Sequence, residues 1–189
     1  MAEALVTRDF TPSEMAAIAD VSTSLQRVWR QRGILSERKT EGWTRFTLEE
    51  VILAKVIRMS SRLGAPIEEA QCIATKACAP IFTWLFLEPG SHVIEDAAGK
   101  EFTPRRKTSK STIRFLAVAH GHQIFTDDFD AGEFLDRISG HEDLGSLNRA
   151  IENVPASTVF DLQRIAKDIA ERAGLPLFRG ETDFRYEGK

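Results

Sequence analysis

Apolar positions spaced three and four residues apart predict four short helices in the first eighty positions. A capping box, Thr11-Pro12-Ser13-Glu14, begins the first helix, and a cap at Ser22 begins the second. Another capping box, Thr47-Leu48-Glu49-Glu50, begins the third. The expected helices cover about residues 12–19, 23–32, 48–63 and 66–79, and Pro80 ends the fourth because proline cannot continue the helical hydrogen bonds.

The segment 34–46 between the second and third helices has no helical period. It carries charged residues around Gly42 and ends in the aromatic Trp43 and Phe46, which predicts a short hairpin with Gly42 in its turn. Helix, tight turn, helix, hairpin, helix is the order of a winged helix-turn-helix. Such a domain places one helix in the major groove of DNA and its hairpin, the wing, beside the flanking backbone.

Beyond Pro80 the chain becomes richer in aromatic and β-branched residues, broken by turn residues, and this pattern predicts a small antiparallel sheet. A helix capped at Asp130 and a last helix over about 157–173 are expected after it, with a loose tail from Gly174. The fold class is therefore α+β. We expect a winged helix-turn-helix DNA-binding domain in residues 1–79 and an effector or dimerisation domain in 80–189. The expected strands are Ile81–Leu87, His92–Glu95, Ile113–Ala119 and Gln123–Thr126.

The second helix is the candidate DNA-reading element, with Val21, Leu25 and Val28 expected to face inward. Its other face combines hydroxyls, an amide and guanidiniums, which can address base edges and phosphates. The wing adds cations that can reach phosphates at any sequence. Although the net charge of the whole chain is −3, nine basic and four acidic residues lie between Ser22 and Arg62. The predicted DNA contacts are Thr23, Ser24, Gln26, Arg27 and Arg30 in the helix and Arg38, Lys39, Trp43 and Arg45 in the wing.

These residues also carry a resemblance to a known family. Val21-Ser22, then Arg27, Trp29 and Gly33-Ile34-Leu35 resemble the Val-Ser, Arg-Tyr-Tyr and Gly-Leu-Leu pattern of the MerR family, and Gly42 to Thr47 is similar to that family's wing. The resemblance covers about seventy residues. It implies a dimeric transcription regulator on double-stranded, palindromic DNA, with Arg27 at the position of a DNA-contacting arginine and Trp43 at the wing aromatic position.

The C-terminal half departs from that family, because Pro80 and the predicted strands stand where its long coiled coil would follow. Homodimerisation is therefore expected through the apolar face of the last helix, at Leu162, Ile165 and Ile169. The C-terminal domain could pair subunits, bind a small effector or dock another protein. An effector site would open a cavity among the aromatic residues Phe82, Trp84, Phe86 and Phe115, whereas a pairing or docking domain would be filled there.

No recognisable catalytic motif, cofactor motif or metal motif is present, so neither an enzyme nor a cofactor is expected. Cys72 and Cys78 lack the two-residue spacing of zinc and redox motifs and are expected to be buried, reduced thiols. Histidines 92, 120 and 122, three of the four in the chain, have no accompanying ligand at diagnostic spacing. The basic run Arg105-Arg106-Lys107 is either a charged loop or a second DNA contact.

Neither a secretory leader nor an apolar run of about 18 residues is evident, so a cytoplasmic protein without a membrane partner is expected. The alternative to DNA binding is a protein–protein adaptor that uses the same helical module, because arginines on a helix also occur on an ordinary solvated face.

Overall fold

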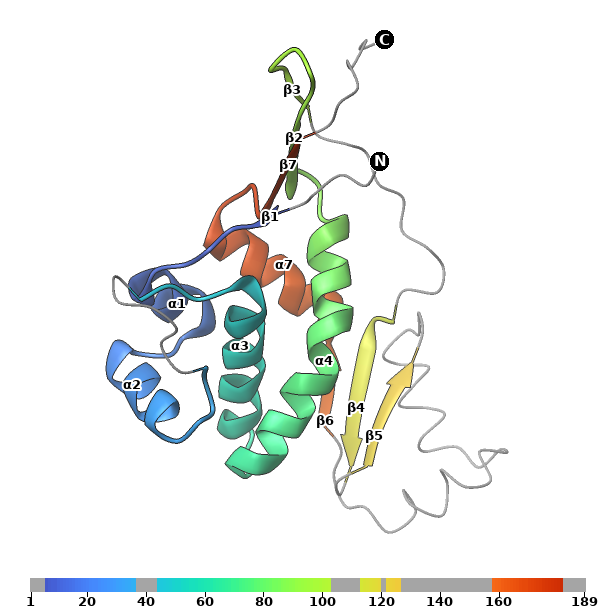
Figure 1. Cartoon of the computed structure of the whole chain (residues 1–189). Helices are drawn as coiled ribbons and strands as arrows, with labels where there is room; N and C mark the ends of the chain where they lie inside the picture. The colour runs from blue at the N-terminus through green and yellow to red at the C-terminus, as the bar shows by residue number, and fades with distance from the viewer. Residues whose placement is uncertain (1–5, 37–43, 103–112, 120–121, 127–157, 182–189) are drawn as a thin grey trace, which may run out of the picture.

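The computed structural model describes residues 6–36, 44–102, 113–119, 122–126 and 158–181, and in them it combines helices with two small sheets. The fold is of the α+β class, as predicted. The described helices are α1 (Pro12–Ala19), α2 (Thr23–Gln31), α3 (Leu48–Arg62), α4 (Ile67–Leu87) and α7 (Leu162–Ala173). Figure 1 shows α1 and α2 on one side of α3, and α4 on its other side.

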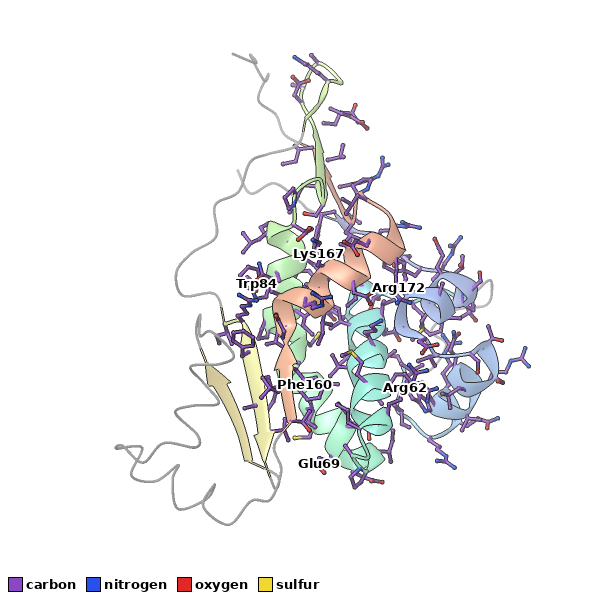
Figure 2. All side chains as sticks on the ribbon, turned by 180° about the vertical axis from the view of Figure 1, so that it is seen from behind. Arg62, Glu69, Trp84, Phe160, Lys167 and Arg172 are labelled. Atoms are coloured by element: carbon purple, nitrogen blue, oxygen red, sulfur yellow. The ribbon has the colours of Figure 1, made fainter. Side chains whose placement is uncertain are left out.

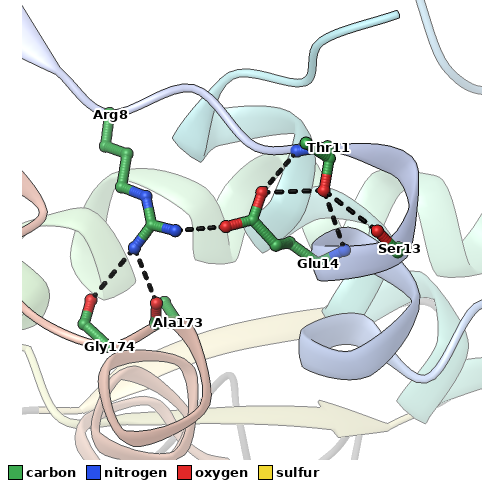
Figure 3. Close-up of polar contacts among 6 residues, drawn as sticks. All are labelled: Arg8, Thr11, Ser13, Glu14, Ala173 and Gly174. Carbon is green, nitrogen blue, oxygen red and sulfur yellow. Dashed lines mark hydrogen bonds and ion pairs between the residues drawn. The ribbon is translucent and has the colours of Figure 1, made fainter.

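The two capping boxes form as predicted. Thr11 accepts a hydrogen bond from the backbone of Glu14, whose carboxylate accepts one in return from the Thr11 backbone, and Thr47 and Glu50 do the same at α3. Figure 3 shows the first box extended by Arg8, which pairs with Glu14 and donates to the carbonyl oxygen of Ala173 at 2.7 Å. Arg8 thus ties the start of α1 to the carboxyl end of α7, where a cation also meets the negative end of the helix dipole.

Helix α4 corrects the sequence prediction, because it continues through Pro80 to Leu87 instead of ending at Ala79. The predicted strand 81–87 is helical, with Ile81, Trp84 and Leu85 buried at helical spacing. Burial against α3 and α7 therefore outweighs the local strand preference of its aromatic residues. Among the described residues, α4 also has the length and mean hydropathy (1.3) of a membrane span, a test that the core helix of a soluble protein passes too.

The strands form two separate sheets rather than one. In the first, the order is β1-β7-β2-β3, and β7 pairs antiparallel with β1 but parallel with β2. In the second, β4 lies between β5 and β6 and is antiparallel to both. The strands are β1 (Val6–Thr7), β2 (His92–Glu95), β3 (Glu101–Phe102), β4 (Phe115–Ala119), β5 (His122–Thr126), β6 (Thr158–Asp161) and β7 (Phe178–Glu181).

These strands confirm the prediction for His92–Glu95 and, within two residues, those at β4 and β5. Residues 175–181 are not a loose tail, since Leu177 and Phe178 are buried and β7 lies inside the first sheet. The last helix begins at Leu162, because the preceding four residues pair with β4 as β6. The predicted helix after Asp130 lies outside the described residues.

Helix α7 joins the two halves of the chain. It packs against α4 and α1, and one continuous cluster of buried side chains contains residues from Phe10 to Phe178. The expected domain boundary between residues 79 and 80 therefore falls inside α4 and inside this cluster. Figure 2, seen from behind, shows α7 crossing α3 and α4.

Candidate nucleic-acid interface

Gln26 fixes the junction between α1 and α2. Its side-chain amide is 3% exposed and donates to the carbonyl oxygens of Pro12 and Val21, both at 2.9 Å. Asp20, in the left-handed conformation (φ 58°), ends α1, and Ser22 then caps α2 by accepting from the backbone of Leu25. Gln26 was predicted to contact DNA, and this prediction is wrong because its side chain is used inside the junction.

The exposed face of α2 differs in phase from the predicted one. Trp29 is buried beside Gln26, whereas Val28, which was expected to face inward, is 38% exposed. Two turns of α2 therefore expose hydroxyl, guanidinium, methyl and amide groups on one side. The sequence prediction missed two residues of this side, Val28 and Gln31. The exposed residues of this face, called the α2 face below, are Thr23, Ser24, Arg27, Val28 and Gln31.

Arg30 supports the α2 face from its edge. Its guanidinium carbon lies 4.4 Å from the centre of the Phe46 ring, and its Nη1 donates to the Thr44 hydroxyl at 3.4 Å. Within the described part of the chain, its buried Nε has no hydrogen-bond partner. Arg30 is thus half-buried between α2 and the segment before α3, which suits positioning better than direct reading of bases.

Of the segment 34–46 that was predicted to form the wing, the structure describes residues 34–36 and 44–46. Arg45 is exposed, and Phe46 pairs with Phe10 through two backbone hydrogen bonds of 2.8 Å, so the chain enters α3 beside the start of α1. The predicted hairpin turn and three of its predicted contacts, Arg38, Lys39 and Trp43, lie outside the described residues.

Part of the basic charge in this region is neutralised. Lys55 is 8% exposed and pairs with Asp168 of α7 at 2.6 Å, while Arg62 pairs with Asp20. Burial alone raises the pKa of Asp168, but hydrogen bonds and charge from Lys55 and Arg172 outweigh it and leave the pKa lowered. Between Ser22 and Arg62, the exposed arginines with no ion pair to another described residue are Arg27, Arg32 and Arg45.

The face of α7 that was expected to pair two subunits is part of the core. Leu162, Ile165 and Ile169 are at most 5% exposed and belong to the buried cluster shared with α1 and α4. The prediction of dimerisation through these residues is therefore wrong, because the helix already covers its apolar face within one chain.

The aromatic residues expected around an effector cavity are also packed. The rings of Phe82 and Phe86 meet the ring of Phe178 edge to face at 5.4 and 5.3 Å, and Phe115 is 5% exposed. The indole nitrogen of Trp84 donates to the carbonyl oxygen of Ile113 at 2.8 Å. The rings named here therefore pack against their neighbours instead of opening the cavity that was expected of an effector site.

The described cysteine and histidine side chains do not come together in a metal or redox site. Cys72 is exposed, contrary to prediction, while burial, reinforced by the charge of Glu49, raises the pKa of the half-buried Cys78 to about 11. Such a pKa keeps the Cys78 thiol protonated and unreactive at neutral pH. His92 is buried between aromatic rings, and its Nδ1 lies 2.7 Å from the Ser91 hydroxyl. No group of three or more potential metal ligands occurs among the residues that the structure describes.

In comparisons with known proteins, no family model and no curated protein matches this chain. The likeness to the MerR family therefore depends on the residues quoted above, and membership in that family stays a prediction.

Proposed function

We propose that the chain is a sequence-specific DNA-binding transcription regulator in which α1 and α2 form a helix-turn-helix and α2 enters the major groove. The two helices are short, individually capped and joined by a tight turn that Gln26 fixes from inside. Residues between α2 and α3 would supply the wing, with Arg45 at its end.

The observation that carries this proposal is the exposure of the α2 face. Arg27 is exposed beside Thr23 and Ser24, while Gln26 and Trp29 hold the opposite side of the helix in the core. An arginine in the major groove can donate two hydrogen bonds to guanine, and the two hydroxyls can contact either bases or phosphates. Arg45 lies outside this face and would contact the backbone, which adds affinity without sequence preference.

The test is DNA selection followed by binding measurements at several salt concentrations. Arg27→Ala should weaken binding to the selected sequence by about 1–3 kcal/mol, because a base contact is lost. Arg45→Ala should weaken binding to all sequences and lower the salt slope by about one unit. Arg164→Ala is the matched control, since it removes one exposed arginine from α7 and should change neither quantity.

Absence of any DNA complex at low salt would refute the proposal. If complexes form, footprinting would also test the predicted dimer, for which two half-sites about ten base pairs apart, or a multiple of that, are expected.

The adaptor alternative has one observation in its favour. Val28 places an exposed apolar side chain in the middle of the α2 face, and such a residue could equally enter a hydrophobic pocket of a protein partner. Under this alternative, Val28→Ser would abolish partner capture, while purified protein would bind no DNA.

A further inference from the structure

A cavity of about 530 Å³ lies where the turn between α3 and α4 meets the second sheet. Its size falls within the range of pockets that hold small organic ligands. The wall comes from segments far apart in the chain. The turn and the first part of α4 form one side, and β4 and β6 form the other; the residues important here are Ser60, Glu69, Ile73, Val118, Thr158 and Phe160. Figure 2 labels two of them, Glu69 on α4 and Phe160 on β6.

The lining combines buried apolar side chains with one partly exposed carboxylate. Ile73, Val118 and Phe160 are between 2% and 7% exposed, and they supply a hydrophobic surface. Glu69 is half-exposed and forms no ion pair with another described residue. A ligand with an apolar body and a positively charged end would satisfy both parts of the wall.

Ser60 of α3 also belongs to the wall of this cavity. It is 1% exposed and belongs to the cavity wall, yet its hydroxyl has no hydrogen-bond partner in the described structure. Serine within a helix commonly bonds to the carbonyl four residues earlier, and buried polar groups without partners are rare. The hydroxyl itself is buried, so it lies behind the surface of the wall and is not among the ligand contacts proposed below.

The amino end of α4 carries a partial positive charge, which would favour an anionic ligand. This effect has to be compared with that of the nearby carboxylates. Pro66 caps α4 without a side-chain hydrogen bond, which leaves a partial positive charge of about half a unit at the helix end. Glu68 and Glu69 both lie in the first turn and bring full negative charges to the same place. Only Glu69 belongs to the cavity wall, and its full charge alone outweighs the half unit of the dipole, so the wall favours cations over anions.

We propose that this cavity binds a small organic cation, an amine with an apolar ring or chain, with Glu69 facing the ammonium group and Phe160, Val118 and Ile73 contacting the apolar body. The inference goes beyond the proposed function, because it concerns a different surface from the α2 face. Since α3 and α4 contribute one side of the wall and the second sheet the other, an occupied cavity would hold these two parts together.

Three probes of nearly equal size test this proposal on the full chain: 4-phenylbutylamine, 4-phenylbutanol and 4-phenylbutyrate. Backbone amide NMR signals would be followed during titration. We expect saturable shifts at residues of the cavity wall, with the amine binding about three to ten times more tightly than the alcohol. Glu69→Gln should bring the amine and the alcohol to the same affinity. Glu68→Gln, the adjacent change with the same loss of charge, should preserve the preference because Glu68 is not in the wall.

Thr158→Phe is a second variant, which places a ring in the cavity and should weaken all three probes together. The proposal is overturned if the wall signals do not shift saturably, if the butyrate binds best, or if Glu69→Gln leaves the preference for the amine intact. An unchanged amine affinity in a folded Thr158→Phe protein would overturn it as well. None of these readouts involves DNA, so they are independent of the proposed function.

Discussion

Gln26 was expected to contact DNA bases, but its amide holds the junction between α1 and α2. This structural role can be measured through the stability of the protein. Gln26→Ala would leave the carbonyl oxygens of Pro12 and Val21 without their amide donor in the core. We expect it to lower the free energy of unfolding by about 1–3 kcal/mol in urea titration. Gln31→Ala on the exposed side of the same helix is the control and should stay within about 0.5 kcal/mol. Equal stability of the two variants would contradict the assignment.

Asp168 predicts a specific loss of stability in acid. Because its pKa is lowered in the folded state, its contribution is complete above the pKa of the unfolded chain, near 3.8, and is lost as the pH falls through the folded value. Asp168→Asn should therefore cost about 1 kcal/mol at pH 7, allowing for partial solvent exposure, and less at pH 3. Urea titrations at both pH values measure this. Glu171→Gln, whose carboxylate is exposed on α7, is the control and should change stability at pH 7 by less than about 0.5 kcal/mol.

Residues whose roles are set by near neighbours in sequence could be predicted, whereas those set by distant contacts could not. The boxes at Thr11 and Thr47 involve atoms three residues apart, so the sequence contains all the necessary information. The inward side of α2 was placed on Leu25 and Val28, because apolar residues normally define it. The buried side includes Gln26 instead, because Pro12 at the start of α1 and Val21 in the turn offer its amide two carbonyl oxygens.

Among the elements, α4 shows why the C-terminal half was less predictable. A proline followed by Ile81, Phe82 and Trp84 indicates the end of a helix and the start of a strand, and only packing against α3 and α7 reverses that preference. The strand β7 was missed for a related reason. Four residues ending in Gly180 and Glu181 carry little strand pattern, and their position between β1 and β2 comes from partners distant in sequence.

For the packing of the helices, we predict the effect of one substitution in α7. Ile169→Ala should lower the free energy of unfolding by about 2–5 kcal/mol, because the side chain is fully buried against neighbouring helices. Glu171→Ala, on the exposed side of α7, should change stability by less than about 0.5 kcal/mol. Denaturant titration gives the stabilities, and analytical ultracentrifugation gives the mass in solution. A stable Ile169→Ala protein with a changed oligomeric state would restore the original dimer interpretation.

At the scale of the whole molecule, the described helices share one core, and this makes the expected domain boundary testable. A fragment of residues 1–79 would lack the later part of α4 and all of α7, which bury Ile81, Leu85 and Ile169 in the common cluster. We expect the fragment to show no cooperative thermal transition by circular dichroism, while the full chain unfolds cooperatively. Cooperative unfolding of the fragment with native helix content would show that the two halves fold separately.

The link between Arg8 and the carbonyl oxygen of Ala173 joins positions separated by 165 residues. During synthesis at about 5–20 residues per second, the second partner is made on the order of 10–30 s after the first. Until then β1 also lacks β7, so the emerging segment before α1 has neither its strand neighbour nor its clamp. The segment before α1 therefore stays without these partners while the intervening residues are made, and chaperones would meet it before the link closes.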